Sequence, residues 1–138
     1  MNRVLTIVML LMISLSGMAQ NKCINMSKVY DFSLKDKSGK EVSLSQYKGK
    51  VLLIVNTATG CGFTPQYEDL EAMYHSLKDK GLEILDVPCD QFGHQAPGTD
   101  AEIKEFCTLK FGADFPQFKK SDVNGANELP LYTWLKSQ

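Results

Sequence analysis

The sequence lacks several features that would assign it at once to a common class. No two of its four cysteines form a C-x-x-C pair, which is the spacing of a zinc knuckle or a dithiol redox site. It has no block of like charges, and its formal net charge is −1. Composition therefore gives no electrostatic reason to expect nucleic acid or an anionic membrane as a partner. It also lacks internal repeats and linkers, which predicts one domain.

A long hydrophobic run is missing as well. The apolar stretch at residues 4–15 follows one positive charge and is shorter than the roughly 20 apolar residues that span a bilayer. Small residues, Gly17 and Ala19, follow it. A charged start, a short apolar run and a small-x-small site are typical of a secretory signal peptide. We expect residues 1–19 to be cleaved on export, which leaves residues 20–138 as a bacterial periplasmic or secreted domain.

The remaining chain alternates strand and helix patterns. Residues 30–34 and 41–44 alternate apolar and polar side chains around a turn, which predicts a hairpin. Residues 51–55 form a continuous β-rich apolar run, which predicts a strand buried on both faces. A helix follows, with Thr64 as its N-cap and Gly81 at its end, and then a strand at 82–87. Strand, helix and strand of these lengths predict a right-handed βαβ unit with parallel strands.

Two further helices are predicted near the C-terminus. Thr99 and Glu102 form a capping box, and this helix closes near Gly112. A last short helix is predicted over residues 129–135, after an irregular apolar segment at 115–118.

The chemical features converge on Cys61. It follows the predicted strand at 51–55, in the crevice beyond the carboxyl end of a parallel sheet, where open α/β folds place their sites. It precedes a helix start, where unpaired N–H groups and the positive helix end stabilise a thiolate. Gly60 and Gly62 flank it and leave the sulfur uncovered. We therefore predict a reactive thiolate rather than a packing cysteine.

Thr64 stands where a dithiol motif beginning at Cys61 would have its second cysteine. Without a neighbouring thiol, the site suits chemistry in which the thiolate attacks something other than a disulfide. Peroxide oxygen is the obvious candidate.

Three stretches now point to a known family. Residues 56–67 (NTATGCGFTPQY), residues 88–98 (PCDQFGHQAPG), and residues 122–125 (DVNG) followed by 130–132 (PLY) resemble motifs of the glutathione peroxidases. The resemblance covers nearly all of residues 27–138. It implies an α/β, thioredoxin-like fold with a central sheet, flanking helices and an N-terminal hairpin. It also implies reduction of hydrogen peroxide or organic hydroperoxides in oxidative-stress defence, without a metal or organic cofactor.

The resemblance assigns roles to three residues. Cys61 takes the place of the peroxidatic residue, and Gln95 that of the glutamine that hydrogen-bonds the thiolate and the peroxide. Cys107 matches the resolving cysteine of the branch reduced by thioredoxin-like proteins; glutathione is the other reductant implied. Cys107 shares a helix face with Ile103 and Phe106, so a plain core thiol remains the alternative. Its pairing with Cys61 is expected to require local unwinding, because cysteines with Cα atoms more than about 7 Å apart cannot bridge without movement.

The sequence also departs from the family pattern. Asp90 stands where asparagine is usual, and Ala96 where glutamate is usual. The chain ends at Gln138, before the family's Trp-Asn-Phe motif, two strands and a closing helix, so this part is expected to be missing. The Trp and Asn of that motif complete the family's catalytic tetrad, and Trp134 precedes the motif and is no substitute for its Trp.

The stretch between Asp122 and Pro130 carries no insertion. In this it resembles the short members of the family, which are often monomers, and we expect a monomer here.

Three other interpretations stay open. The chain could act as a thioredoxin-like oxidoreductase on protein disulfides, although it lacks C-x-x-C. It could be a truncated, inactive domain. A metal site could combine Cys61, Cys89, His94 and Cys107. Cys89 itself is assigned to packing, and no role is assigned to Cys23.

Overall fold

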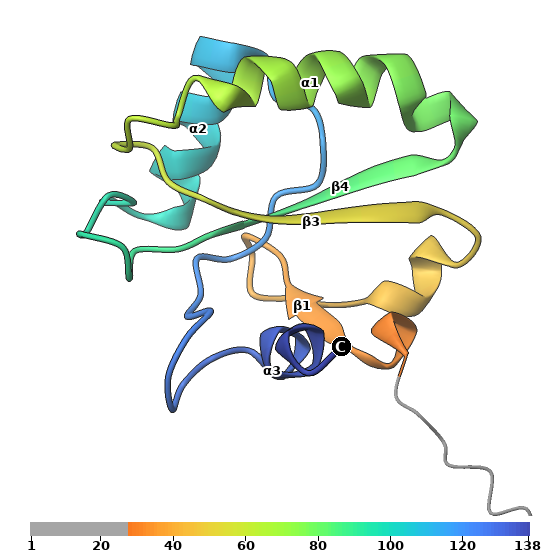
Figure 1. The fold of residues 1–138 in the computed structure, drawn as a ribbon. Helices are drawn as coiled ribbons and strands as arrows, with labels where there is room; N and C mark the ends of the chain where they lie inside the picture. The colour runs from red at the N-terminus through yellow and green to blue at the C-terminus, as the bar shows by residue number, and fades with distance from the viewer. Residues whose placement is uncertain (1–27) are drawn as a thin grey trace, which may run out of the picture.

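The computed structural model describes residues 28–138, arranged in layers around two central strands (Figure 1). The signal-peptide prediction and Cys23 lie outside the described residues. The elements are, in chain order, η1 (Val29–Asp31), β1 (Ser33–Lys35), β2 (Glu41–Ser43), η2 (Leu44–Tyr47), β3 (Val51–Thr57), α1 (Gln66–Leu77), η3 (Lys78–Lys80), β4 (Leu82–Pro88), α2 (Asp100–Phe111) and α3 (Pro130–Lys136), where η marks a 3-10 helix.

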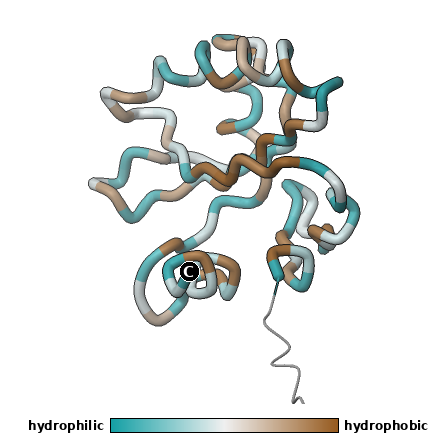
Figure 2. The backbone as a smooth tube through the Cα atoms, turned by 45° about the vertical axis from the view of Figure 1, so that its right-hand side comes forward, coloured by the Kyte–Doolittle hydropathy of each residue, from teal (hydrophilic) through white to brown (hydrophobic). Residues whose placement is uncertain are grey.

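β3 and β4 are parallel and joined through α1, which confirms the predicted βαβ unit. Their register runs from the pair Val51 and Leu82 to the pair Thr57 and Pro88. Figure 2 shows strongly hydrophobic backbone running through the middle of the molecule, where these strands lie. Both strands end beside the loop that carries Cys61, so the sheet places this loop at its carboxyl edge.

The two faces of β4 hold two hydrophobic clusters. Ile84 lies in the cluster beneath α1 and α2, whereas Leu85 and Val87 lie in the cluster with the hairpin and α3. This division follows from the alternation of side chains along a strand. Figure 1 shows α1 and α2 on one side of the strands, and β1 and α3 on the other.

The prediction that the first parallel strand is buried on both faces is wrong. Val51 is 70% exposed, and the rest of β3 is only partly buried. Among the described residues only β4 pairs with β3, so its other edge stays open. β4 is the buried strand, apart from its first residue. The segment around Gln117 covers its second edge: Asp86 donates its N–H to Pro116 at 2.9 Å, and Phe118 donates to Asp86 at 2.8 Å.

The start of α1 also differs from the prediction. Thr64 does not cap the helix, which begins at Gln66 after Pro65. The Thr64 hydroxyl is engaged within the preceding loop instead. The helix ends as predicted, with a 3-10 turn closed by Gly81 at φ 98°, where glycine carries no steric penalty.

The other predicted elements are close to those observed. The capping box of Thr99 and Glu102 is present, α2 ends at a left-handed Gly112, and α3 begins one residue later than predicted. The hairpin is real, but its first strand begins at Ser33, because the Asp31 carboxylate accepts the Lys28 N–H at 2.8 Å and closes a 3-10 turn before it.

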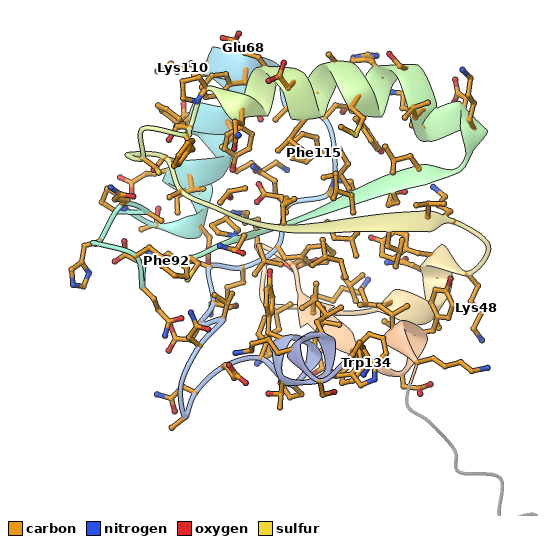
Figure 3. All side chains as sticks on the ribbon, in the orientation of Figure 1. Lys48, Glu68, Phe92, Lys110, Phe115 and Trp134 are labelled. Carbon is orange, nitrogen blue, oxygen red and sulfur yellow. The ribbon has the colours of Figure 1, made fainter. Side chains whose placement is uncertain are left out.

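Aromatic side chains fill both layers. Phe115 lies between α1 and the strands, and Trp134 lies on α3 (Figure 3). The Trp134 ring packs on Phe32 at a centroid distance of 5.5 Å. Within residues 28–138, no helix combines the length and apolarity needed to cross a membrane.

Candidate functional site

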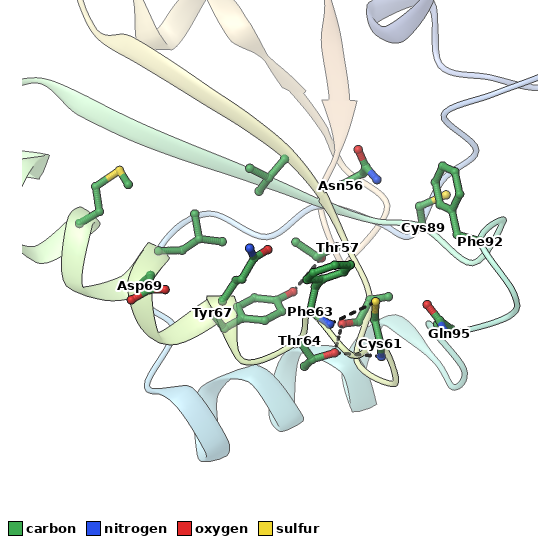
Figure 4. Close-up of a pocket in the computed structure, with 15 residues that line it drawn as sticks. Asn56, Thr57, Cys61, Phe63, Thr64, Tyr67, Asp69, Cys89, Phe92 and Gln95 are labelled. Atoms are coloured by element: carbon green, nitrogen blue, oxygen red, sulfur yellow. Dashed lines mark hydrogen bonds between the residues drawn. The ribbon is translucent and has the colours of Figure 1, made fainter.

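Cys61 and Gln95 line one pocket of about 650 Å³ at the carboxyl ends of the parallel strands (Figure 4). The pocket lies between the Cys61 loop, the first turns of α1 and the loop after β4. The structure therefore brings together two of the three residues assigned from the sequence.

The Cys61 loop is held by one threonine. The Thr64 hydroxyl accepts the backbone N–H of Cys61 at 3.0 Å and donates to the Ala58 carbonyl at 2.8 Å. The turn that follows places the Phe63 N–H 3.4 Å from the Cys61 sulfur, as a donor. Cys61 is partly exposed. A backbone N–H is thus directed at the sulfur of Cys61, to which it can donate a hydrogen bond.

The Gln95 loop is bent by residues in the left-handed region. His94 has φ 52°, and the glycine before it has φ 69°. The Asp90 carboxylate accepts the Ala96 N–H at 2.8 Å and contacts the His94 ring at 3.2 Å. These hydrogen bonds lower the pKa of Asp90, and the one with His94 has the largest effect. The aspartate that departs from the family pattern thus shapes the loop that carries Gln95.

Gly60 joins the two loops. Its N–H donates to the Gln95 carbonyl at 2.7 Å, and a Cβ at this glycine would lie 3.2 Å from the same oxygen. The close approach of backbone to backbone is the reason for glycine here.

Gln91 fixes the loop after β4 to the segment around residue 124. Its amide oxygen accepts the N–H groups of Val123 and Asn124, each at 2.9 Å, and its amide nitrogen donates to the Asn124 carbonyl at 2.9 Å. No role was predicted for Gln91, although it lies within the motif at residues 88–98. The Cys89 thiol donates weakly to Gln91 at 3.7 Å; it is buried and also lines the pocket.

The apolar lining of the pocket was also missed. Phe63 is 74% exposed and Phe92 50% exposed at its rim, and Leu70 and Met73 contribute from α1. Trp134 is not among the lining residues.

Cys107 lies apart from the pocket. It is fully buried on α2, in the cluster with Tyr67 and Ile103. Burial raises the pKa of its thiol, although contacts with Tyr67 and Gln117 act against this. Cys61, Cys89 and Cys107 are all outside disulfides. The resolving role of Cys107 therefore stays a prediction, and it needs movement of α2.

The alternative metal set is not assembled. Over residues 28–138, no three His, Cys, Asp or Glu side chains lie close enough together to hold a metal ion. Cys61 and Cys89 share the pocket, whereas Cys107 is buried in the core.

A buried carboxylate behind the pocket was missed altogether. Asp86 on β4 is 0% exposed, and burial raises its pKa. It accepts hydrogen bonds from Thr57 at 2.5 Å, Tyr67 at 2.9 Å and Gln117 at 2.8 Å. The available signal was a charged residue within an apolar strand pattern, which Asp86 shares with Glu83.

Comparison of the sequence with known proteins gives consistent matches. The family model for glutathione peroxidase matches residues 29–136. The chain is 56% identical over 113 residues to the glutathione peroxidase-like peroxiredoxin HYR1 of Saccharomyces cerevisiae, covering 82% of this chain and 69% of the yeast protein. It is 58% identical over 109 residues to a glutathione peroxidase homolog of Neisseria meningitidis, covering 79% of this chain and 62% of that protein. The chain thus spans about two thirds of the length of these relatives.

Solved structures agree. The crystal structure of T. cruzi GPX1 superposes with a TM-score of 0.63 at 38% identity, over 80% of this chain and 66% of that one. A thiol:disulfide interchange protein from Bacteroides sp. has a TM-score of 0.50 at 24% identity, over 65% of this chain and 55% of that one, and so shares the fold alone. Together these matches confirm the expected thioredoxin-like fold.

Proposed function

The chain belongs to the glutathione peroxidase family, and we propose that it is a thiol peroxidase whose nucleophile is Cys61. The substrate is hydrogen peroxide or an organic hydroperoxide. The observation that carries the proposal is the partly exposed Cys61 sulfur at the pocket, with the Phe63 N–H directed at it.

The reaction follows from this geometry. The Cys61 thiolate attacks the terminal oxygen of the hydroperoxide, the O–O bond breaks, and Cys61 becomes a sulfenic acid. The departing oxygen takes a proton and leaves as water or an alcohol. Gln95 lines the same pocket and offers an amide N–H to the sulfur or the peroxide. The apolar walls around Phe63 and Phe92 limit the water that competes for these hydrogen bonds.

The second half of the cycle returns Cys61 to the thiol. Cys107 attacks the sulfenic acid, forming a disulfide and releasing water. A thiol reductant, a thioredoxin-like protein or glutathione, then reduces the disulfide by thiol exchange.

Stopped-flow measurement of peroxide consumption by the reduced chain tests the proposal. Cys61→Ser is expected to slow the reaction by roughly a hundredfold or more, because it removes the nucleophile. Cys89→Ser is the matched control, since Cys89 lines the same pocket. Equal rates for the unaltered chain and Cys61→Ser, or loss of activity in the Cys89 variant alone, would overturn the assignment.

The alternative activity on protein disulfides has weaker support. Thr64 occupies the position of the second cysteine, and its hydroxyl bonds the Cys61 backbone instead. We expect insulin reduction by this chain to stay at the rate of a buffer containing dithiothreitol alone. Rapid reduction would favour the oxidoreductase interpretation.

We further propose that the chain is exported and acts as a monomer. The support for export is the N-terminal sequence pattern, and for a monomer the absence of an insertion between Asp122 and Pro130. N-terminal sequencing of the protein from a bacterial periplasm, with cleavage expected after residue 19, and light scattering of the purified chain test the two statements.

A further inference from the structure

We propose that Asp86, acting through the Tyr67 hydroxyl, is a positioning residue that accepts the Cys107 proton when Cys107 resolves oxidised Cys61. The inference rests on the proposed peroxidase function and assigns a second-step role to groups that the peroxide step does not use.

The carboxylate of Asp86 is fully enclosed and fully engaged. Oδ1 accepts the Thr57 hydroxyl at 2.5 Å, and Oδ2 accepts the Tyr67 hydroxyl at 2.9 Å and the Gln117 amide at 2.8 Å. A charge in such a place is costly even when paired, and apolar packing would serve stability as well or better. A buried, perturbed carboxylate beside a cleft is therefore a candidate for function.

Tyr67 connects this carboxylate with Cys107. Its hydroxyl contacts Asp86 at 2.9 Å and the Thr57 hydroxyl at 2.7 Å, and it lies near enough to the Cys107 thiol for each group to shift the pKa of the other. Its ring packs in the same cluster as Cys107, and its side chain also lines the pocket of Cys61. Tyr67 thus lies between the two cysteines of the proposed cycle.

Cys107 needs a nearby proton acceptor because its thiol is buried. Burial raises the pKa of its thiol, so few molecules hold the thiolate that attacks a sulfenic acid. Burial also raises the pKa of Asp86, which makes its carboxylate a better proton acceptor.

Other charged and titratable groups surround the cluster, and the Asp86 charge itself adds to the raised pKa of Cys107. The Lys37 nitrogen is buried and has no hydrogen-bond partner among the described residues, and its positive charge stabilises both the Asp86 carboxylate and a Cys107 thiolate. Asp100 and Lys104 on α2 face Lys37. From α3, Tyr132 faces Asp86, whose charge helps to raise the pKa of that tyrosine.

The proposed step is balanced in protons and electrons. Cys107 passes its proton to the Tyr67 oxygen while Tyr67 passes its hydroxyl proton to Asp86. The thiolate then leaves the cluster with the moving segment of α2 and attacks the Cys61 sulfenic sulfur. The S–S bond forms and the S–O bond breaks, so Cys107 is oxidised and Cys61 reduced. The leaving hydroxide takes the proton back from Asp86 through Thr57, which contacts Asp86 and lines the pocket, and departs as water.

The test measures the two steps separately in the full chain. Dimedone trapping reports the sulfenic acid, and alkylation with mass spectrometry reports the Cys61–Cys107 disulfide, over pH 5 to 9. Asp86→Asn is expected to leave sulfenic acid formation unchanged and to slow disulfide formation roughly a hundredfold near pH 7. The disulfide rate should then rise in proportion to hydroxide, which a purely structural role would not produce.

Glu83 supplies the matched control. It is another buried carboxylate on β4, 4% exposed, and it accepts a tyrosine hydroxyl, that of Tyr74, at 3.0 Å. Glu83→Gln and Tyr74→Phe are expected to leave both steps unchanged. Tyr67→Phe keeps the packed ring, and it should slow the disulfide step relative to the first step; this variant decides the question if Asp86→Asn fails to melt cooperatively.

Two results overturn different statements. If sulfenic acid forms but Asp86→Asn and Tyr67→Phe keep the rate and pH profile of disulfide formation, the role of Asp86 is wrong and the peroxidase proposal stands. If the unaltered chain forms no sulfenic acid, the peroxidase proposal fails, and this inference fails with it.

Discussion

Gly60 has no side chain, and this lets the Gln95 loop approach the Cys61 loop. Because a Cβ at Gly60 would lie 3.2 Å from the Gln95 carbonyl, Gly60→Ala must push the two loops apart by a few tenths of an ångström. We expect peroxide oxidation of Cys61 to slow by up to roughly tenfold, since small displacements of a positioned group weaken catalysis. Stopped-flow oxidation measures the effect.

Gly62 is the control for this substitution. It flanks Cys61 on the other side, and a Cβ there would have nothing within 4 Å. Gly62→Ala should therefore react with peroxide at close to the unaltered rate. A slow Gly62→Ala with a fast Gly60→Ala would show that exposure of the sulfur matters, and not the approach of the two loops.

Individual residues differ in how far the sequence could predict them. The site of Cys61 follows from local features, a strand before it and a helix after it, and the structure places it on a pocket accordingly. Gln95 was assigned from its motif alone, because its position depends on the His94 and Asp90 geometry of a loop. Asp86 was missed because its partners come from three distant segments.

Helix α2 carries Cys107, so the proposed second step requires this helix to open. Thr99 caps this helix: its hydroxyl accepts the Glu102 N–H at 3.3 Å, and the Glu102 carboxylate accepts the Thr99 N–H at 2.7 Å. Thr99→Ala should lower the free energy of unfolding by about 1 kcal/mol. Since about 1.4 kcal/mol is a tenfold change, local opening and Cys61–Cys107 disulfide formation should become roughly fivefold faster.

Urea melts and the alkylation assay measure these two effects. Ser43→Ala serves as control, because Ser43 caps the distant 3-10 helix η2 through the Ser45 N–H at 3.3 Å. It should lower stability without changing disulfide formation. If Thr99→Ala is destabilised but forms the disulfide no faster, α2 does not open from its N-terminal end.

Elements with local signals could be predicted well. The βαβ unit, the capping box of α2 and the last helix all follow from periodicity, caps and glycines. The burial of β3 could not be predicted, since it depends on which strands pair with its edges. The same holds for residues 115–118, whose apolar sequence gave no sign that Phe118 bonds the β4 backbone.

At the scale of the whole molecule, buried tyrosines set how stability responds to alkali. Burial raises the pKa of Tyr67 and of Tyr132, and raises that of Tyr74 to about 12. The folded chain therefore keeps these protons above pH 10, where the unfolded chain releases them. Because the folded state binds more protons, it becomes less stable relative to the unfolded state as pH rises. The free energy of unfolding therefore falls from about pH 10 upward. Lys37 is a single group that acts in the opposite direction, because burial lowers its pKa.

Tyr67→Phe gives the sharpest test of this fall in the free energy of unfolding at alkaline pH, here called the alkaline limb. Tyr67 is 2% exposed, so each folded molecule retains nearly one proton at this site across the limb. Removing the hydroxyl should make the fall of unfolding free energy with pH shallower by up to ~1.4 kcal/mol per pH unit. Tyr74→Phe should act only between about pH 10 and 12, because its folded pKa lies at the upper end of that window. Urea melts at half-unit steps from pH 8 to 12 measure the slopes.

At pH 8 neither variant should change the slope, because these tyrosines are then protonated in both states. A limb as steep in Tyr67→Phe as in the unaltered chain would mean that the hydroxyl is not held protonated by the fold, and would also remove the proton path assigned to it.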